Sequence, residues 1–201
     1  IAVSITSETT GASIRYATDG GKPTTNSFLY SAPIPVTNTT VLRAAAFKAG
    51  ALPTDTDTHS YIFVDDVLRQ SDSPAGFPLI WTNRHGYATA ADYGMDSNVV
   101  DGALYGPVMT QAVAALPFLS LATARTNVFD PMTGIYANPL ESDIAWEREV
   151  SLEIVSTNRM DDEQVDCGLS IYGETESRTF LNTRKKSFAL AFRGEYGRGR
   201  L

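Results

Sequence analysis

Cysteine and histidine are both scarce in this sequence. The 201 residues include one cysteine, Cys167, so a disulfide within the chain is excluded. Cys167 lies in an alternating apolar pattern, and we expect it to be a small buried side chain. The two histidines, His59 and His85, are far apart in sequence, which argues against a histidine metal site. We therefore expect no metal centre.

Long apolar runs are also missing. No run approaches the roughly 18 apolar residues that a membrane helix needs, and no basic segment followed by an apolar one marks a secretion signal. We therefore expect no membrane span. The sequence opens on Ile1 rather than Met, so we expect a processed protein or a piece of a longer one. A hydrophobic content of 43% with 19% charged residues is typical of a globular protein with a core.

The chain has no excess of positive charge. Its formal net charge is −7, and residues 1–64 contribute nothing to it, with four basic and four acidic side chains. Residues 141–176 hold eleven acidic and two basic side chains, whereas residues 178–201 hold one acidic and seven basic ones. A nucleic-acid-binding domain is usually basic overall, so we expect no nucleic-acid partner. The basic end can form a local phosphate site, or it can simply neutralise the acidic block across the surface.

Short strand patterns alternate with turn signals over residues 1–64. The patterns are rich in Val, Ile, Thr and Tyr and cover Ala2–Thr6, Ser13–Ala17, Thr40–Phe47 and His59–Phe63. The Asp19-Gly20 step is typical of a hairpin turn, because glycine accepts a positive φ. Strands at this spacing predict a small antiparallel β-sandwich.

Three segments of this region resemble a known family. They are Thr10–Thr24, Leu29–Ile34 and Thr40–Gly50. Together they closely resemble the immunoglobulin-like domain at the C-terminus of chitobiases and hexosaminidases, which is reused in many secreted bacterial proteins. The resemblance implies an immunoglobulin-like β-sandwich over residues 1–64 that acts as a spacer or docking module. It also implies an extracellular or cell-surface location.

Residues 65–103 contain many chain breakers and few apolar periods, so we expect a long connector. It carries four large aromatic residues, Phe77, Trp81, Tyr87 and Tyr93. Such rings can stack on a sugar or a base, and they can also anchor an otherwise irregular segment to the flank of the next domain by burial. If the segment binds carbohydrate, Trp81 and Tyr87 are the candidate residues.

Residues 104–201 predict an α+β module. Apolar spacings of three and four predict a helix over Leu104–Leu116, with Pro107 in its first turn and Pro117 at its end. A short strand is expected at Phe118–Ala122. Three further alternating runs predict an antiparallel sheet at Val150–Val155, Val165–Tyr172 and Lys185–Phe192. The whole chain is therefore expected to be mostly β.

Six ordered blocks in this half carry a second resemblance. They are Asp92–Asp96, Leu116–Ser120, Gly134–Asn138, Trp146–Arg148, Gln164–Gly168 and the stretch from Lys185 to Gly197. Together they look like the opening portion of the spore coat protein H (CotH) kinase family in its secreted multidomain bacterial form. The resemblance implies an incomplete N-terminal lobe of an atypical kinase-like phosphotransferase, whose full-length parent would use ATP with magnesium.

The resemblance also implies which residues would bind phosphate. Lys185 matches the lysine of the family's Pro-Lys-X-Ser-Phe block, and Lys186 is the second candidate. Arg178 and Arg184 are expected to assist as anion clamps. A lone strand lysine is also often a solvated edge charge. The metal-binding residues of such an enzyme would follow Leu201, so this chain alone is expected to be inactive.

Two interpretations remain open. In the first, the chain is a spacer followed by a partial nucleotide-side lobe, and its main partner is the remainder of its own polypeptide. In the second, it is a carbohydrate-associated or cell-surface interaction scaffold without catalysis, with a protein or polysaccharide partner.

Overall fold

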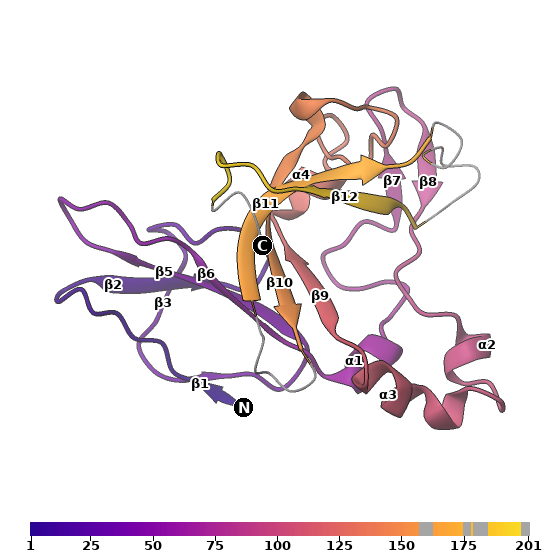
Figure 1. The fold of residues 1–201 in the computed structure, drawn as a ribbon, viewed down its shortest axis with the longest axis horizontal. Coiled ribbons are helices and arrows are strands. Elements are labelled where there is room, and N and C mark those ends of the chain that lie inside the picture. Colours follow the sequence, from indigo (N-terminus) through magenta and orange to yellow (C-terminus); the bar gives the residue numbers. More distant parts are fainter. Residues whose placement is uncertain (157–162, 175–177, 179–184, 198–201) are drawn as a thin grey trace.

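The computed structural model describes residues 1–156, 163–174, 178 and 185–197 (Figure 1). Its regular structure is mostly strand and forms two four-stranded antiparallel sheets and two smaller strand pairs. This confirms the predicted mostly β fold, with a β-sandwich followed by an α+β module. We call strands β1 to β6 the N-terminal module, and the described residues from α1 onward the C-terminal module.

The N-terminal module consists of a four-stranded sheet, in the order β3-β2-β5-β6, and a separate two-stranded sheet, β1-β4. The strands are β1 (Ala2–Val3), β2 (Ser13–Ala17), β3 (Phe28–Leu29), β4 (Ile34–Pro35), β5 (Thr40–Phe47) and β6 (Asp57–Tyr61). Strand neighbours point to opposite faces of a sheet, yet Leu42 and Arg43 of β5 are only 4% and 2% exposed. Both faces of β5 are therefore covered.

The C-terminal module is built on the sheet β12-β11-β10-β9. Its strands are β9 (Phe118–Ala122), β10 (Arg148–Val155), β11 (Glu163–Tyr172) and β12 (Ser187–Ala191), all antiparallel to their neighbours. Alternation places Leu152, Val165 and Cys167 on one face, where they are almost completely buried. Burial raises the pKa of the Cys167 thiol to about 11, so the group stays protonated at neutral pH.

Strand β12 begins two residues later than the sequence predicted. The ladder with β11 ends at the pair Tyr172 and Ser187. The backbone N–H of Lys186 donates instead to the hydroxyl of Tyr136, at 2.9 Å. The predicted strand start at Lys185 is therefore corrected to Ser187, because a side-chain hydroxyl replaces the ladder partner.

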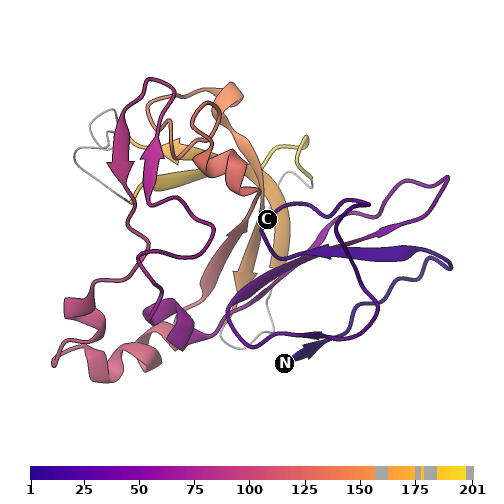
Figure 2. The ribbon, with the colours of Figure 1, turned by 180° about the vertical axis from the view of Figure 1, so that it is seen from behind.

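The predicted connector contains regular elements of its own. They are α1 (Val64–Leu68), β7 (Ile80–Thr82), β8 (Ala88–Ala90) and α2 (Ser97–Val100), with β7 and β8 forming a hairpin. The predicted helix is α3 (Gly106–Ala114), and α4 (Arg125–Phe129) and the 3-10 turn η1 (Ile144–Trp146) follow β9. Helices α2 and α3 lie at the opposite end of the module from the hairpin (Figure 2). Among the described residues, no helix has the length and apolar character to cross a membrane.

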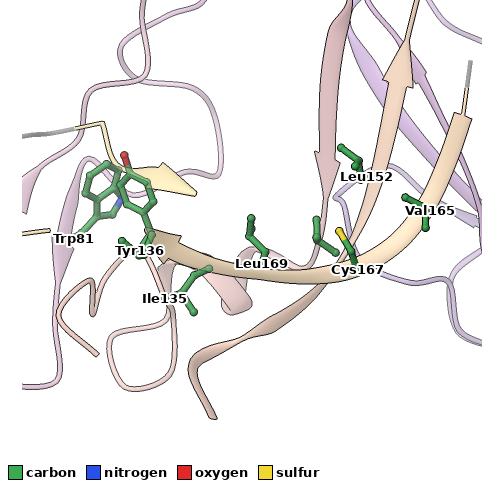
Figure 3. Close-up of a cluster of buried hydrophobic side chains, with 9 residues drawn as sticks. Trp81, Ile135, Tyr136, Leu152, Val165, Cys167 and Leu169 are labelled. Carbon is green, nitrogen blue, oxygen red and sulfur yellow. The ribbon is translucent and has the colours of Figure 1, made fainter. Parts of the chain in front are cut away.

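The main core joins the hairpin to the large sheet (Figure 3). Trp81 from β7 lies with Ile135 and Tyr136 from the loop after α4, and this group continues into the apolar face of β10 and β11. The ring of Trp81 meets that of Tyr136 edge-on at 4.6 Å between centroids and stacks on Phe129 at 5.8 Å. Trp81, one of the four aromatic residues of the expected connector, thus anchors it by burial.

Candidate functional site

The two predicted phosphate-binding lysines have different environments. The side chain of Lys185 is 57% exposed, and its Nζ lies 3.6 Å from Oδ1 of Asp92. The same ammonium donates to the carbonyl of Gly94 at 2.6 Å. Lys186 is only 7% exposed, and burial lowers its pKa. Lys185 is therefore the one that a solvent anion reaches more easily.

Of the two arginines predicted to clamp an anion, the structure describes only one. Nε of Arg178 donates to the carbonyl of Gly173 at the end of β11, which holds the guanidinium close to its own turn. Arg184 lies outside the described residues. The structure therefore brings together Lys185, Lys186, Asp92 and Tyr136, and of the two arginines it describes only Arg178.

The two predicted sugar-binding aromatic residues also differ. Trp81 is 2% exposed, and its Nε1 donates to the Tyr93 hydroxyl at 3.2 Å. No ring face of Trp81 is open, so the prediction that it stacks on a sugar does not fit this conformation. Tyr87 is 69% exposed near the turn of the β7–β8 hairpin and stays a candidate.

The hairpin turn that presents Tyr87 is held by two asparagines. Oδ1 of Asn83 accepts hydrogen bonds from the backbone N–H groups of His85, at 2.9 Å, and of Tyr87, at 3.0 Å. Oδ1 of Asn138 accepts from the N–H of Arg84 at 2.9 Å. These side-chain amides accept hydrogen bonds from backbone N–H groups of the turn. The backbone that carries the exposed ring of Tyr87 is therefore held in place.

An arginine pair near this turn has no counterpart in the sequence predictions. The ring of half-buried Trp146 has the guanidinium carbon of Arg84 at 5.7 Å and that of Arg148 at 5.4 Å from its centroid. Arg84 also lies 3.5 Å from the carboxylate of Glu141. Contacts of this kind stabilise a surface by roughly 0.5 to 1 kcal/mol each when exposed. The two arginines come from segments far apart in sequence, so no local pattern could have indicated them.

The described residues contain no group of three or more His, Cys, Asp or Glu side chains with the geometry to hold a metal ion.

The outer face of the C-terminal sheet is polar but buried. Ser151 and Glu153 of β10 point away from the core face, yet they are 0% and 5% exposed. Thr58 and Ser60 of β6 are 1% and 6% exposed. These two polar surfaces cover each other where the β6 edge of the N-terminal sheet meets β10 (Figure 1). We call this contact the module junction.

At the module junction, side chains of the C-terminal sheet accept hydrogen bonds from backbone N–H groups on the free edge of β6. The N–H of Ser60 donates to Oε2 of Glu153 at 2.6 Å, and the N–H of Thr58 donates to Oε1 of Gln164 at 3.0 Å. Glu153 and Gln164 are direct partners on β10 and β11, so they present two acceptors side by side. The Ser60 hydroxyl adds a bond to Ser120 of β9 at 2.6 Å. The edge is thereby blocked against pairing with another strand.

Arg43 and Gly20 complete the module junction. The Arg43 guanidinium donates to the carbonyl of Gly20 at 2.9 Å and to that of Ala122 at 3.5 Å, and burial lowers the pKa of this side chain. Gly20 has a φ of 85°, and a Cβ placed on it would lie 2.5 Å from the Thr123 carbonyl oxygen. Only glycine therefore lets the turn approach β9 this closely. Lys22 and Glu149 form an ion pair beside it.

A cleft with a volume of about 770 Å³ opens beside the module junction. Its N-terminal wall includes Asp19, Asn38 and Thr39, and its C-terminal wall includes Phe77 and Arg125. Sequence reasoning missed this cleft because its walls are separated by tens of residues in the chain. Phe77 was one of the four aromatic residues noted in the expected connector, but the carbohydrate candidates chosen there, Trp81 and Tyr87, do not line the cleft.

Comparison with known proteins identifies the N-terminal part alone. Residues 1–59 match the model of the chitobiase/beta-hexosaminidase C-terminal domain, in agreement with the first resemblance. The match covers 59 of the 201 residues. No match was found among curated proteins or among solved structures. The resemblance of the C-terminal half to the CotH kinase family stays a prediction.

Proposed function

From the match of residues 1–59 to a chitobiase/beta-hexosaminidase C-terminal domain, we propose that this chain is a non-catalytic, carbohydrate-associated scaffold. It belongs to a secreted or cell-surface multidomain protein. The N-terminal module serves as a fixed spacer. The hydrogen bonds of Ser60 and Thr58 to Glu153 and Gln164 support this role, because they hold the spacer in one orientation.

The proposal predicts that the purified chain binds an insoluble glycan. We expect it to co-sediment with chitin, and we expect serum albumin, which serves as the control, to stay in solution. Cellulose as a second matrix tests whether the acetamido group of chitin contributes. Equal recovery of the chain and of albumin in the supernatant on both matrices would show that the proposal is wrong.

A second candidate function is the nucleotide-side lobe of a CotH-type kinase, with ATP and magnesium as cofactors of the complete protein. Three of the blocks that carry the resemblance meet in space. Lys185 contacts Asp92 and Gly94, and the N–H of Lys186 contacts Tyr136. A lysine paired with a carboxylate is one of the parts that protein kinases use to hold phosphates.

The second candidate predicts that Lys185→Ala weakens the binding of ATP with magnesium. Loss of one charge-assisted phosphate contact is expected to reduce affinity about tenfold. Lys48→Ala is the matched control, because Lys48 is an exposed lysine of the N-terminal module. Isothermal titration calorimetry measures both variants. If the wild-type chain shows no heat of ATP binding, or if the two variants bind equally, the kinase interpretation of Lys185 fails.

A further inference from the structure

The cleft beside the module junction has the size of a small-molecule site. Its volume of about 770 Å³ falls within the roughly 300 to 1,000 Å³ that is usual for ligand pockets, and such pockets occur preferentially between domains. One wall comes from the turn after β2 and the residues around β4, and the other comes from Ala75, Phe77 and α4. A ligand in this cleft would therefore contact both modules at once.

The C-terminal wall presents an aromatic ring in a fixed position. Phe77 is 39% exposed, and its ring packs edge-on against those of Tyr93, at 5.7 Å, and Phe129, at 5.9 Å, between centroids. The guanidinium carbon of Arg125 lies 5.3 Å from the ring centroid, and Arg125 also donates to the carbonyl of Gly76. The ring of Phe77 is thus held from several sides while part of it faces solvent.

The opposite wall presents short polar side chains. Asn38 is exposed, and its side-chain amide makes no hydrogen bond to the described residues. Asp19 uses Oδ1 to accept from the N–H of Gly21 at 3.0 Å, which leaves Oδ2 for a ligand. The loop that carries Asn38 is fixed, because the neighbouring Thr39 bonds to Phe63 and to the carboxylate of Asp66.

We infer that this cleft binds a short neutral oligosaccharide, an inference that rests on the proposed carbohydrate-associated function. A sugar ring has an apolar C–H face, which suits the ring of Phe77, and a hydroxyl edge, which suits Asn38 and Asp19. The cleft lining holds one carboxylate, Asp19, and one guanidinium, Arg125, so its formal charges cancel. This balance favours a neutral ligand over an anionic or cationic one.

The test measures binding of the tetramer of N-acetylglucosamine, with cellotetraose as the second probe, by calorimetry and by NMR shifts. Phe77→Leu keeps an apolar side chain but removes the ring face, and we expect about tenfold weaker binding. Asn38→Ala removes an exposed amide without touching the packing, and we expect severalfold weaker binding with an unchanged melting temperature. In the wild-type chain, amide shifts should gather around Asn38 and Gly76.

Four outcomes would overturn the inference. If both cleft variants bind like wild type, the sugar lies elsewhere. Loss of binding in Tyr87→Ala with intact binding in Phe77→Leu would place the sugar on the hairpin. Both of these results leave the proposed function standing. If the soluble tetramers fail to bind although the chain sediments with chitin, the cleft is not the site. If the chain does not sediment either, the proposed function fails as well.

Discussion

Replacing Trp81 with alanine is expected to lower the free energy of unfolding by about 3 to 5 kcal/mol. The side chain is 2% exposed, and its ring contacts those of Phe129, Tyr136 and Tyr93. Removing it leaves a cavity where the β7–β8 hairpin joins the large sheet. Its hydrogen bond to the Tyr93 hydroxyl is lost as well. Urea denaturation followed by circular dichroism measures the change.

The matched control for this substitution is Tyr87→Ala. Tyr87 lies close to Trp81 in sequence but is 69% exposed, so its removal should change the unfolding free energy by less than about 0.5 kcal/mol. If the two substitutions lower the free energy of unfolding by the same amount, Trp81 is not part of the core. The comparison also separates burial from sugar stacking, because a stacking residue on the surface would affect ligand binding but hardly affect stability.

The position of Trp81 shows where sequence patterns fail. Strand β7 has three residues, which is too short for an alternating pattern to stand out among prolines and glycines. The helix and the strand at residues 104–122 were predictable because apolar spacing, Pro107 and Pro117 all agree. Aromatic residues in a breaker-rich segment therefore indicated an anchor, but they did not indicate the hairpin that carries it.

The polar face of the C-terminal sheet shows a second limit of prediction from sequence. Alternation in β10 and β11 predicted both the strands and an apolar face. The same alternation makes Ser151 and Glu153 appear solvent-facing, because antiparallel sheets often expose one polar face to water. The structure instead buries them where β10 meets β6. The carboxylate of Glu153 is satisfied by the N–H of Ser60, whereas the Ser151 hydroxyl has no hydrogen-bond partner among the described residues. A long-range pair such as Ser60 and Glu153 leaves no local pattern.

Lys185 and Lys186 show a third limit of prediction from sequence. Residues 185–192 alternate well enough to predict a strand, but the start of β12 depends on the hydroxyl of Tyr136, which is 50 residues away from Lys186 in sequence. A strand that began at Lys185 would place Lys185 and Lys186 on opposite faces of the sheet. In the structure both precede the strand, and Lys185 turns to Asp92 and Gly94.

Removing the acceptor at position 153 is expected to weaken the module junction. In Glu153→Leu the N–H of Ser60 loses the carboxylate that it contacts at 2.6 Å, and a buried unpaired N–H costs about 1 to 3 kcal/mol. We expect that loss in the free energy of unfolding, measured by urea denaturation. Hydrogen exchange should also speed up at the amide of Ser60, while the amide of Leu42 in the middle of the sheet keeps its protection.

Glu153→Gln separates the hydrogen bond from the charge. The glutamine amide oxygen can accept from the same N–H, and a neutral group is cheaper to bury than a carboxylate, so we expect stability within about 1 kcal/mol of wild type. Slow exchange at Ser60 should persist in this variant. If Ser60 stays equally protected in Glu153→Leu, the carboxylate does not hold the junction. In that case the fixed orientation of the N-terminal module must come from Arg43 and the tight contact of Gly20 with Thr123.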